Sequence, residues 1–365
     1  MSVSSLSVPT VPAARRGWLA VVVRRLVAMG ISLVVALAIA ELVLRLFHLA
    51  PARGIATVNA KQFQRVPGMF APNQRVRDLQ NPALPYVVTI DSLGFRGAEF
   101  TRAKPVNQLR VVMLGDSYVY GDFVDDDQTF PVQLEQRLRR ACGDALVINA
   151  GVGGTTIVDQ AQMLRRTLPL APDAVVLVYV VDDIPSLANS TTSWEQLAEN
   201  REKKSRFPLS IVYPVLRSTA LWNLALKARA ARVNRAGETS LHQNVARDST
   251  GTMNRLRNRY GEALVALRDT LKARGVRFVL TMYPSYAELR DGSANLTWLE
   301  QFAASHDIAA VSFSAVLQAS RLPNTTLYRL PHDGHPGPTG YGIAADTLEK
   351  RVLALGGFPM CRRGA

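Results

Sequence analysis

A serine on a tight, glycine-flanked turn is the residue of this chain best placed for chemistry. Residues 115–121 read Gly-Asp-Ser-Tyr-Val-Tyr-Gly, directly after the apolar stretch 109–114, which predicts a buried strand. Such a turn presents its serine at the carboxyl edge of a sheet, where open α/β folds place their active sites. A serine hydroxyl is a weak nucleophile until a base takes its proton. If Ser117 is a nucleophile, we therefore expect a histidine oriented by a carboxylate beside it.

Residues 332–336, His-Asp-Gly-His-Pro, supply both partner groups near the other end of the chain. His332 and His335 are candidate bases, and Asp333 between them is the candidate orienting acid. A serine on a turn is by itself most often an ordinary turn residue, so the hypothesis depends on the fold bringing Ser117 to one of these histidines.

From residue 109 to residue 355, strand and helix patterns alternate along the chain. Strands are predicted at 86–90, 109–114, 145–149, 174–181, 276–280 and 308–313, and helices at 129–141, 157–168, 252–274, 296–305 and 339–355. This alternation predicts a mostly parallel sheet covered by helices on both faces.

Residues 185–250 interrupt the alternation with a basic, partly helical insertion, including a helix-like piece at 220–231. Between Arg201 and Tyr260 the chain has thirteen Lys and Arg against three Asp and Glu. The insertion is either a solvated face or a contact for anionic lipid or an acidic glycan. Nucleic acid is not expected as a partner, although the net charge is +14, because the chain carries no nucleic-acid-binding motif.

The N-terminal region predicts a membrane anchor. Residues 26–40 are uncharged, and the apolar character continues to residue 47. Four arginines precede residue 26, whereas two, Arg45 and Arg53, follow residue 40. This charge bias places the N-terminus in the cytoplasm and the rest of the chain outside, with residues 26–47 in the inner membrane. A signal peptide cleaved after Ala38-Ile39-Ala40 is the alternative; we favour the anchor because the apolar run continues past that point.

We therefore divide the chain into four parts: a tail and anchor (1–53), a juxtamembrane segment (54–105), a catalytic domain with the insertion (106–356) and a C-terminal tail (357–365). Cys142 and Cys361 follow the first and last predicted core helices, which leaves a disulfide and two free thiols both open. No metal or cofactor is expected: the cysteines form no zinc pattern, and Asp125 to Asp127 lack the other residues of a calcium loop.

Four segments in order resemble the SGNH/GDSL hydrolase superfamily: Gly115-Asp116-Ser117 with Gly121, the glycine-containing run 149–156, the segment 179–184 and Asp333-Gly334-His335-Pro336. Two flanking runs, Asp91 to Gly97 and Gly121 to Leu138, resemble the membrane-anchored bacterial branch of that superfamily. The resemblance covers about 86–184 and 251–355. It implies a three-layer, flavodoxin-like α/β fold and selects His335 over His332 as the base.

The resemblance also implies roles for single residues. Ser117 is the nucleophile, His335 the base and Asp333 the acid, and the backbone N–H groups of Ser117 and Gly154 form an oxyanion hole. The family's third oxyanion donor is an asparagine, but this chain has Asp182 there. An ionised carboxylate would repel the oxyanion. Asp182 is therefore kept neutral by burial, or another donor replaces it, or catalysis is weak.

We accordingly expect an extracytoplasmic serine esterase that acts on O-acyl esters, most simply O-acetyl esters, of an envelope glycan or a related molecule. Two alternatives stay open. The same triad could serve an O-acyltransferase, in which a sugar hydroxyl replaces water, because both reactions share an acyl-enzyme. The chain could also be a non-catalytic envelope binding or assembly module, which the aspartate at 182 and the basic insertion favour.

Overall fold

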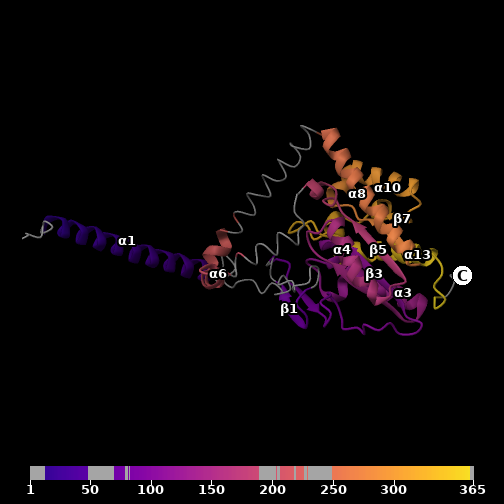
Figure 1. Cartoon of the computed structure of the whole chain (residues 1–365), viewed down its shortest axis with the longest axis horizontal. Coiled ribbons are helices and arrows are strands. Elements are labelled where there is room, and N and C mark those ends of the chain that lie inside the picture. Colours follow the sequence, from indigo (N-terminus) through magenta and orange to yellow (C-terminus); the bar gives the residue numbers. More distant parts are fainter. Residues whose placement is uncertain are drawn as a thin grey trace, which may run out of the picture. The chain divides into compact units, whose positions relative to one another are not determined.

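The structure, a computed structural model, describes residues 13–47, 70–78, 81, 83–188, 203, 206–217, 219–225, 228 and 249–361. Residues 54–69 of the predicted juxtamembrane segment and most of the basic insertion lie outside these ranges. The chain forms two compact units, one of residues 1–54 with 212–232 and one of residues 55–211 with 233–365 (Figure 1). Each unit is described separately.

A five-stranded parallel sheet organises the larger unit. Its strands are β3 (Leu109–Gly115), β4 (Ala145–Gly151), β5 (Ala174–Tyr179), β6 (Arg277–Met282) and β7 (Ala310–Ser312). They pair in the order β4-β3-β5-β6-β7, so β3 lies between β4 and β5. The direction of strand succession reverses at β3, and the carboxyl end of β3 is therefore the switch point at which such sheets bind ligands.

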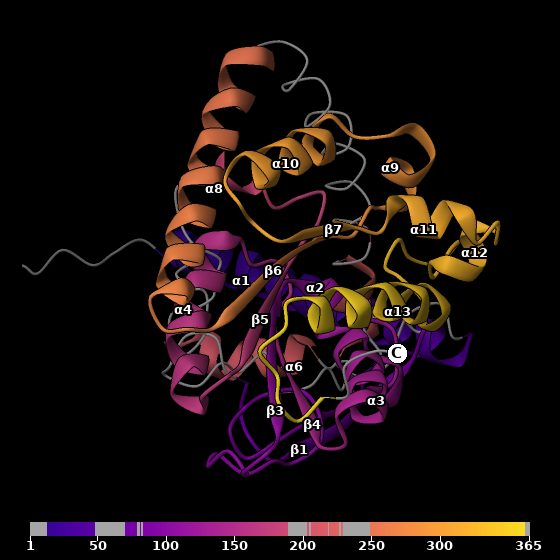
Figure 2. The same cartoon turned by 90° about the vertical axis from the view of Figure 1, so that its right-hand side faces the viewer.

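Helices cover both faces of this sheet, as the sequence predicts (Figure 2). One core contains Val112 and Leu114 of β3 with residues of α4 (Ile157–Thr167), α8 (Ser249–Lys272) and α10 (Ala294–Ser305). The other contains Val111 and Met113 with residues of α3 (Phe130–Cys142), α11 (Ser314–Ala319) and α13 (Pro338–Ala354). Successive side chains of a strand point to opposite faces, so a strand buried on both sides reads as an unbroken apolar run.

Shorter elements surround this three-layer body. A hairpin of β1 (Gln74–Asp78) and β2 (Tyr86–Ile90) is antiparallel. The remaining helical elements are α2 (Ser117–Tyr120), η2 (Asp126–Gln128), η3 (Leu168–Leu170), η4 (Pro185–Ala188), α9 (Tyr286–Asp291) and α12 (Asn324–Leu327). Observed bounds differ from the predicted ones by a few residues, because periodicity locates an element better than its ends.

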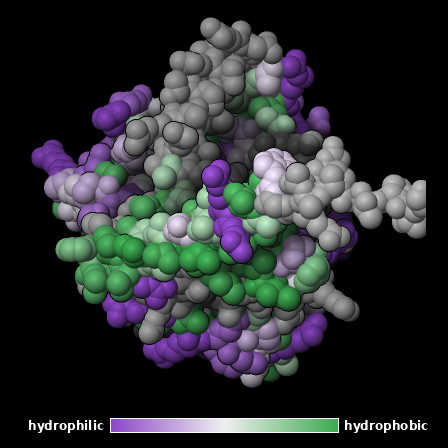
Figure 3. Space-filling view, turned by 90° about the vertical axis from the view of Figure 1, so that its left-hand side faces the viewer, coloured by the Kyte–Doolittle hydropathy of each residue, from purple (hydrophilic) through white to green (hydrophobic). Residues whose placement is uncertain are grey.

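The smaller unit contains the long helix α1 (Ala13–Leu46) and part of α6 (Leu209–Arg217), followed by a helical segment at 220–225. Residues 20–46 have a mean hydropathy of 2.5 and are long enough to cross a membrane. Large apolar side chains on α1 are exposed, including Leu33 (60 %) and Val34 (66 %), and Figure 3 shows a band of hydrophobic residues across the face it presents. The helix begins well before the predicted apolar span, because the arginine-containing stretch before residue 26 is also compatible with helix.

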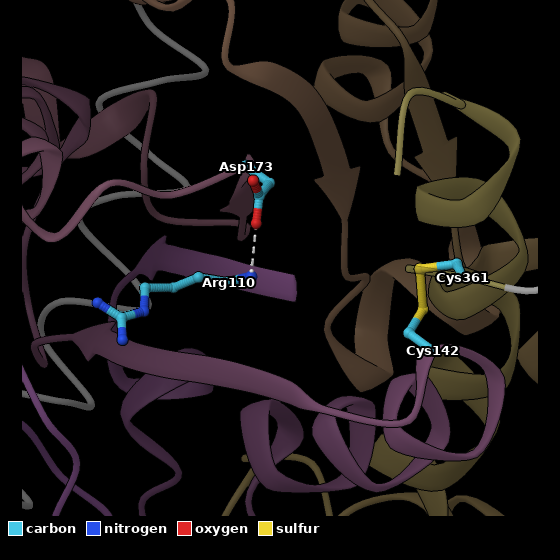
Figure 4. The surroundings of a disulfide bond; sticks show 4 residues. All are labelled: Arg110, Cys142, Asp173 and Cys361. Atoms are coloured by element: carbon cyan, nitrogen blue, oxygen red, sulfur yellow. Dashed lines mark hydrogen bonds between the residues drawn. A yellow bond between two sulfur atoms is a disulfide. The ribbon is translucent and has the colours of Figure 1, made fainter. Parts of the chain in front are cut away.

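Two features stabilise the periphery of the larger unit (Figure 4). The guanidinium of Arg110 is fully buried and donates to the carbonyls of Thr101, Arg102 and Leu170, while its backbone N–H donates to Asp173 at 2.7 Å. Cys142, the last residue of α3, forms a disulfide with Cys361 beyond α13. Of the two states left open by the sequence, the structure has the disulfide.

Candidate active site

The nucleophile candidate sits where α2 crosses the ends of two strands. Ser117 is the first residue of α2; the Asp116 side chain caps that helix by accepting the Tyr118 N–H at 2.9 Å, and Gly121 ends it at φ +90°. The helix lies directly against β4, since a Cβ added to Gly151 would be 2.2 Å from the backbone N of Tyr120. This close contact fixes Ser117 at the switch point of the sheet.

The predicted base and acid reach this serine from the loop before α13. His335 Nε2 lies 2.8 Å from Ser117 Oγ, and His335 Nδ1 lies 2.5 Å from Asp333 Oδ1. The His335 backbone N–H also donates to Asp333 Oδ1, at 2.8 Å. The rings of Tyr118 and Phe123 each have centroids 5.3 Å from that of the imidazole and hold it in place. The three side chains thus have the hydrogen-bond order of a Ser-His-Asp triad.

Charge around the triad favours a protonated imidazole. Burial alone would lower the pKa of His335, but the Asp333 hydrogen bond and the nearby carboxylates of Asp122 and Asp116 raise it above 6.5. Burial would likewise raise the pKa of Asp333, yet the contacts with His335 lower it below 3.8. Asp333 therefore stays ionised and can stabilise an imidazolium formed when Ser117 loses its proton.

The predicted oxyanion loop follows β4 and lies beside the nucleophile. A Cβ added to Gly153 would be 3.7 Å from the Ser117 Cβ, and Gly154 next to it has φ +77°. Thr155 fastens the loop to the end of β3, because its hydroxyl donates to the carbonyls of Gly115 and Val152 at 3.2 and 2.7 Å. A Cβ would strain the backbone of Gly154, which accounts for a glycine there.

Three further carboxyl groups surround the nucleophile. Burial raises the pKa of Asp116 to about 6, and the pKa of the buried Asp183 is raised by burial and by Asp116. Asp183 Oδ2 accepts the Val180 N–H at 3.1 Å. Asp182 is less buried; desolvation raises the pKa of its carboxyl, while His335 lowers it. Its environment therefore moves Asp182 toward the neutral form, in the direction that a hydrogen-bond donor to an oxyanion would need.

Arg96 is a supporting residue to which the sequence analysis gave no role. Its guanidinium is buried and donates to four main-chain carbonyls, those of Val87, Tyr120, Gly121 and Val124, and to the side chain of Asp126. It thereby holds the end of α2 and the loop after it. The run Gly94-Phe95-Arg96-Gly97 is visible in the sequence, but four of the five partners of Arg96 are backbone carbonyls, which leave no pattern in the sequence.

Other candidate residues have structural positions. The backbone carbonyl of His332 accepts a hydrogen bond from Asn81, and His335 rather than His332 contacts Ser117. Asp125 accepts the Val87 N–H at 2.7 Å, and Asp126 pairs with Arg96. Within the described residues no group of His, Cys, Asp and Glu is arranged to hold a metal ion.

The fold and the triad geometry define a serine hydrolase of the three-layer α/β class. The sequence profile of the GDSL-like Lipase/Acylhydrolase family matches residues 113–343, from β3 into α13. The chain belongs to this family, as the resemblance of the four motifs predicts, and is a serine ester hydrolase by type.

Several solved structures are similar to the chain. A GDSL-like lipase from Bacteroides thetaiotaomicron is 14 % identical over 69 % of this chain and 92 % of its own, with a TM-score of 0.39. The psychrotrophic esterase EstA of a Pseudoalteromonas species is 13 % identical over 68 % and 98 %, with a TM-score of 0.37. A G-D-S-L family lipolytic protein of Veillonella parvula is 11 % identical over 67 % and 97 %, with a TM-score of 0.39. A search of curated proteins returned no match.

Proposed function

We propose that the protein is a membrane-anchored, extracytoplasmic serine esterase that removes O-acyl groups, in the simplest case O-acetyl groups, from an envelope glycan or a related molecule. The observation that carries the proposal is the continuous hydrogen-bond chain from Asp333 through His335 to Ser117. Its members come from segments 218 residues apart, so this contact is a product of the fold.

In the proposed reaction the Ser117 oxygen attacks the ester carbonyl while His335 takes the hydroxyl proton. The backbone N–H groups of Ser117 and Gly154 stabilise the tetrahedral oxyanion, and loss of one such donor typically costs about 3 kcal/mol. His335 returns the proton to the leaving alkoxide, and an acyl-enzyme remains on Ser117. Water, deprotonated by His335, then attacks the acyl group and releases the acid and free Ser117.

The proposed location is supported by α1 and by the disulfide. Four arginines precede residue 26 of α1, a charge bias that supports a cytoplasmic N-terminus and a hydrolase domain in the periplasm or its equivalent. The Cys142–Cys361 bond fits an oxidising compartment. In this topology residues 26–47 lie in the inner membrane.

The substrate class follows from the same location. An esterase tethered outside the cytoplasmic membrane faces the acylated carbohydrates of the envelope, which makes an O-acylated glycan the substrate that we favour. An O-acyltransferase is the second candidate, because a sugar hydroxyl can replace water in the deacylation step. Tracking the acetyl group into free acetate or onto the sugar distinguishes the two.

Labelling with a serine-directed fluorophosphonate tests the proposal. We expect the full-length protein to be labelled and to hydrolyse p-nitrophenyl acetate, and we expect Ser117→Ala to lose both properties. The His335→Ala variant should still fold, but the fluorophosphonate should label it far more slowly than the wild type, because Ser117 then lacks its base. If the wild type neither labels nor turns over ester above the Ser117→Ala background, the chain is the non-catalytic envelope module.

A further inference from the structure

The smaller unit joins two segments that are far apart in the sequence through one acidic side chain. Glu41 lies on α1, close to the carboxyl end of its apolar span. Its two carboxylate oxygens accept the backbone N–H groups of Ala220 at 2.8 Å and Leu221 at 3.0 Å. Arg45, one turn further along α1, donates to the same carboxylate at 2.7 Å. A membrane helix that carries an acid with three such partners uses it for a specific contact.

These hydrogen bonds satisfy the start of the helical segment 220–225, whose first N–H groups have no partner within the helix. A negative charge at this end also interacts favourably with the positive end of the helix dipole. Glu41 therefore acts as an N-terminal cap supplied by another segment. The segment that it caps belongs to the insertion between β5 and β6, which returns to the anchor at this point.

Apolar side chains line the contact between α1 and the returning segment. A groove of about 440 Å³ runs there, bordered by Leu37, Ala38, Glu41, Leu216, Thr219, Leu221, Trp222 and Ala225. Three further apolar side chains of the returning segment, which do not line the groove, are exposed: Val212 (43 %), Val215 (63 %) and Leu224 (38 %). Basic residues flank these positions in the sequence, with Arg206 and Arg217 before Ala220 and Lys227 and Arg229 after it.

Glu41 lies near the outer end of the proposed anchor. Residues 26–47, which the proposed topology places in the membrane, extend about 33 Å at about 1.5 Å per residue, close to the roughly 30 Å of a bilayer's hydrocarbon core. Glu41 lies six residues, or about 9 Å, before the end of that stretch. It is therefore in the outer third of the anchor, from which the segment that it caps can reach the headgroup region, where Trp222 and flanking basic side chains are also favourable.

We propose that residues 212–225 lie in the outer interface of the bilayer that α1 crosses, docked on α1 by Glu41, with Val212, Val215 and Leu224 against lipid acyl chains. The proposal rests on the proposed anchoring by α1. The insertion then makes a second membrane contact. The chain would contact the membrane once before β5 in the sequence, through α1, and once after it, through the insertion.

Depth-dependent fluorescence quenching in full-length protein tests this assignment. Both native cysteines are in the disulfide, so single cysteines introduced by Val212→Cys, Leu42→Cys or Val106→Cys can each carry an environment-sensitive dye. Leu42 is exposed on α1, and Val106 is 90 % exposed on the larger unit. The labelled proteins are placed in vesicles of phosphatidylethanolamine and phosphatidylglycerol that contain a lipid spin-labelled near its headgroup.

We expect quenching of Val212→Cys to approach that of Leu42→Cys and to exceed that of Val106→Cys several-fold. Adding Glu41→Ala should reduce the quenching at position 212 and leave that at position 42 unchanged. If position 212 is quenched no more than position 106 while position 42 is quenched, the interfacial assignment is wrong and the anchor stands. If position 42 is not quenched, both fail. Ester hydrolysis by the same samples reports on Ser117 independently.

Discussion

Asp182 occupies the place where the resemblance leads us to expect an asparagine, and its carboxyl is the residue-scale feature that most affects the proposed chemistry. Asparagine has nearly the same shape and donates hydrogen bonds at every pH. We expect Asp182→Asn to raise kcat for p-nitrophenyl acetate at neutral pH by up to about 10²-fold, because the fraction of Asp182 that stays ionised repels the oxyanion, whereas asparagine is a donor throughout.

The comparison with Asp182→Ala separates two effects of that substitution. Alanine removes the charge without adding a donor, so it should recover only part of the gain. If Asp182→Asn lowers kcat at all pH values, the native carboxyl is itself a donor or positions one, and the repulsion argument is wrong.

The pH dependence of hydrolysis depends on His335, which must be neutral to accept the proton of Ser117. Since its pKa is raised, the imidazole is still protonated at a pH where an ordinary histidine is neutral. We therefore expect kcat/KM to rise with pH through a midpoint above 6.5 and then to level off. Asp333→Asn should move that midpoint to lower pH and reduce kcat by about 10⁴-fold. A midpoint that stays in place in this variant would show that Asp333 does not act on His335.

Of the candidate site, the sequence led to Ser117, Asp333 and His335 because their chemistry restricts the residue types and the motif carries them. The structure brings these three together. The sequence gave no indication of a role for Arg96, because most of its partners are backbone carbonyls, which every residue has. It also gave no indication of Glu41 as a cap, because its partners lie 179 and 180 positions away.

At the scale of elements, the contact between α2 and β4 determines where the nucleophile stands. A Cβ at Gly151 would be 2.2 Å from Tyr120 N and 2.7 Å from the carbonyl carbon of Val119. These are backbone atoms that cannot rotate away. We expect Gly151→Ala to lower the free energy of unfolding by about 1–3 kcal/mol and to reduce esterase activity further, because α2 must shift.

Gly251→Ala is a matched control for this substitution. Gly251 is an exposed position in α8, where a Cβ would only contact the end of the Arg255 side chain at 3.6 Å. Thermal unfolding should show this variant as stable as the wild type or slightly more stable, since alanine favours helix. Equal effects of the two substitutions would contradict the packing argument.

The strands of the sheet could be predicted because each is buried on both faces and has to be apolar throughout. Residues 174–179 and 109–114 illustrate this. The division into two units could not be predicted in the same way. Residues 212–225 contain many apolar residues, as a core helix would, and they belong to the smaller unit because the chain contacts α1 there, in part through the N–H groups of Ala220 and Leu221.

At the scale of the whole molecule, the order of strands divides the triad between two stretches of chain. Ser117 precedes the insertion between β5 and β6, whereas Asp333 and His335 follow it. The two stretches also meet at the Cys142–Cys361 bond and in the parallel pairing of β5 with β6. One connection is covalent and the other is not.

A nick therefore need not inactivate the enzyme. If a specific protease site inserted after Leu241 is cleaved, the amino-terminal piece keeps the nucleophile and the other piece keeps the base and its acid. We expect one band on a non-reducing gel, two bands after reduction, and nearly full turnover of p-nitrophenyl acetate before reductant is added. The protein would then behave as a two-chain hydrolase whose halves share one covalent bond, which a thiol reductant breaks, while the pairing of β5 with β6 remains as the non-covalent connection.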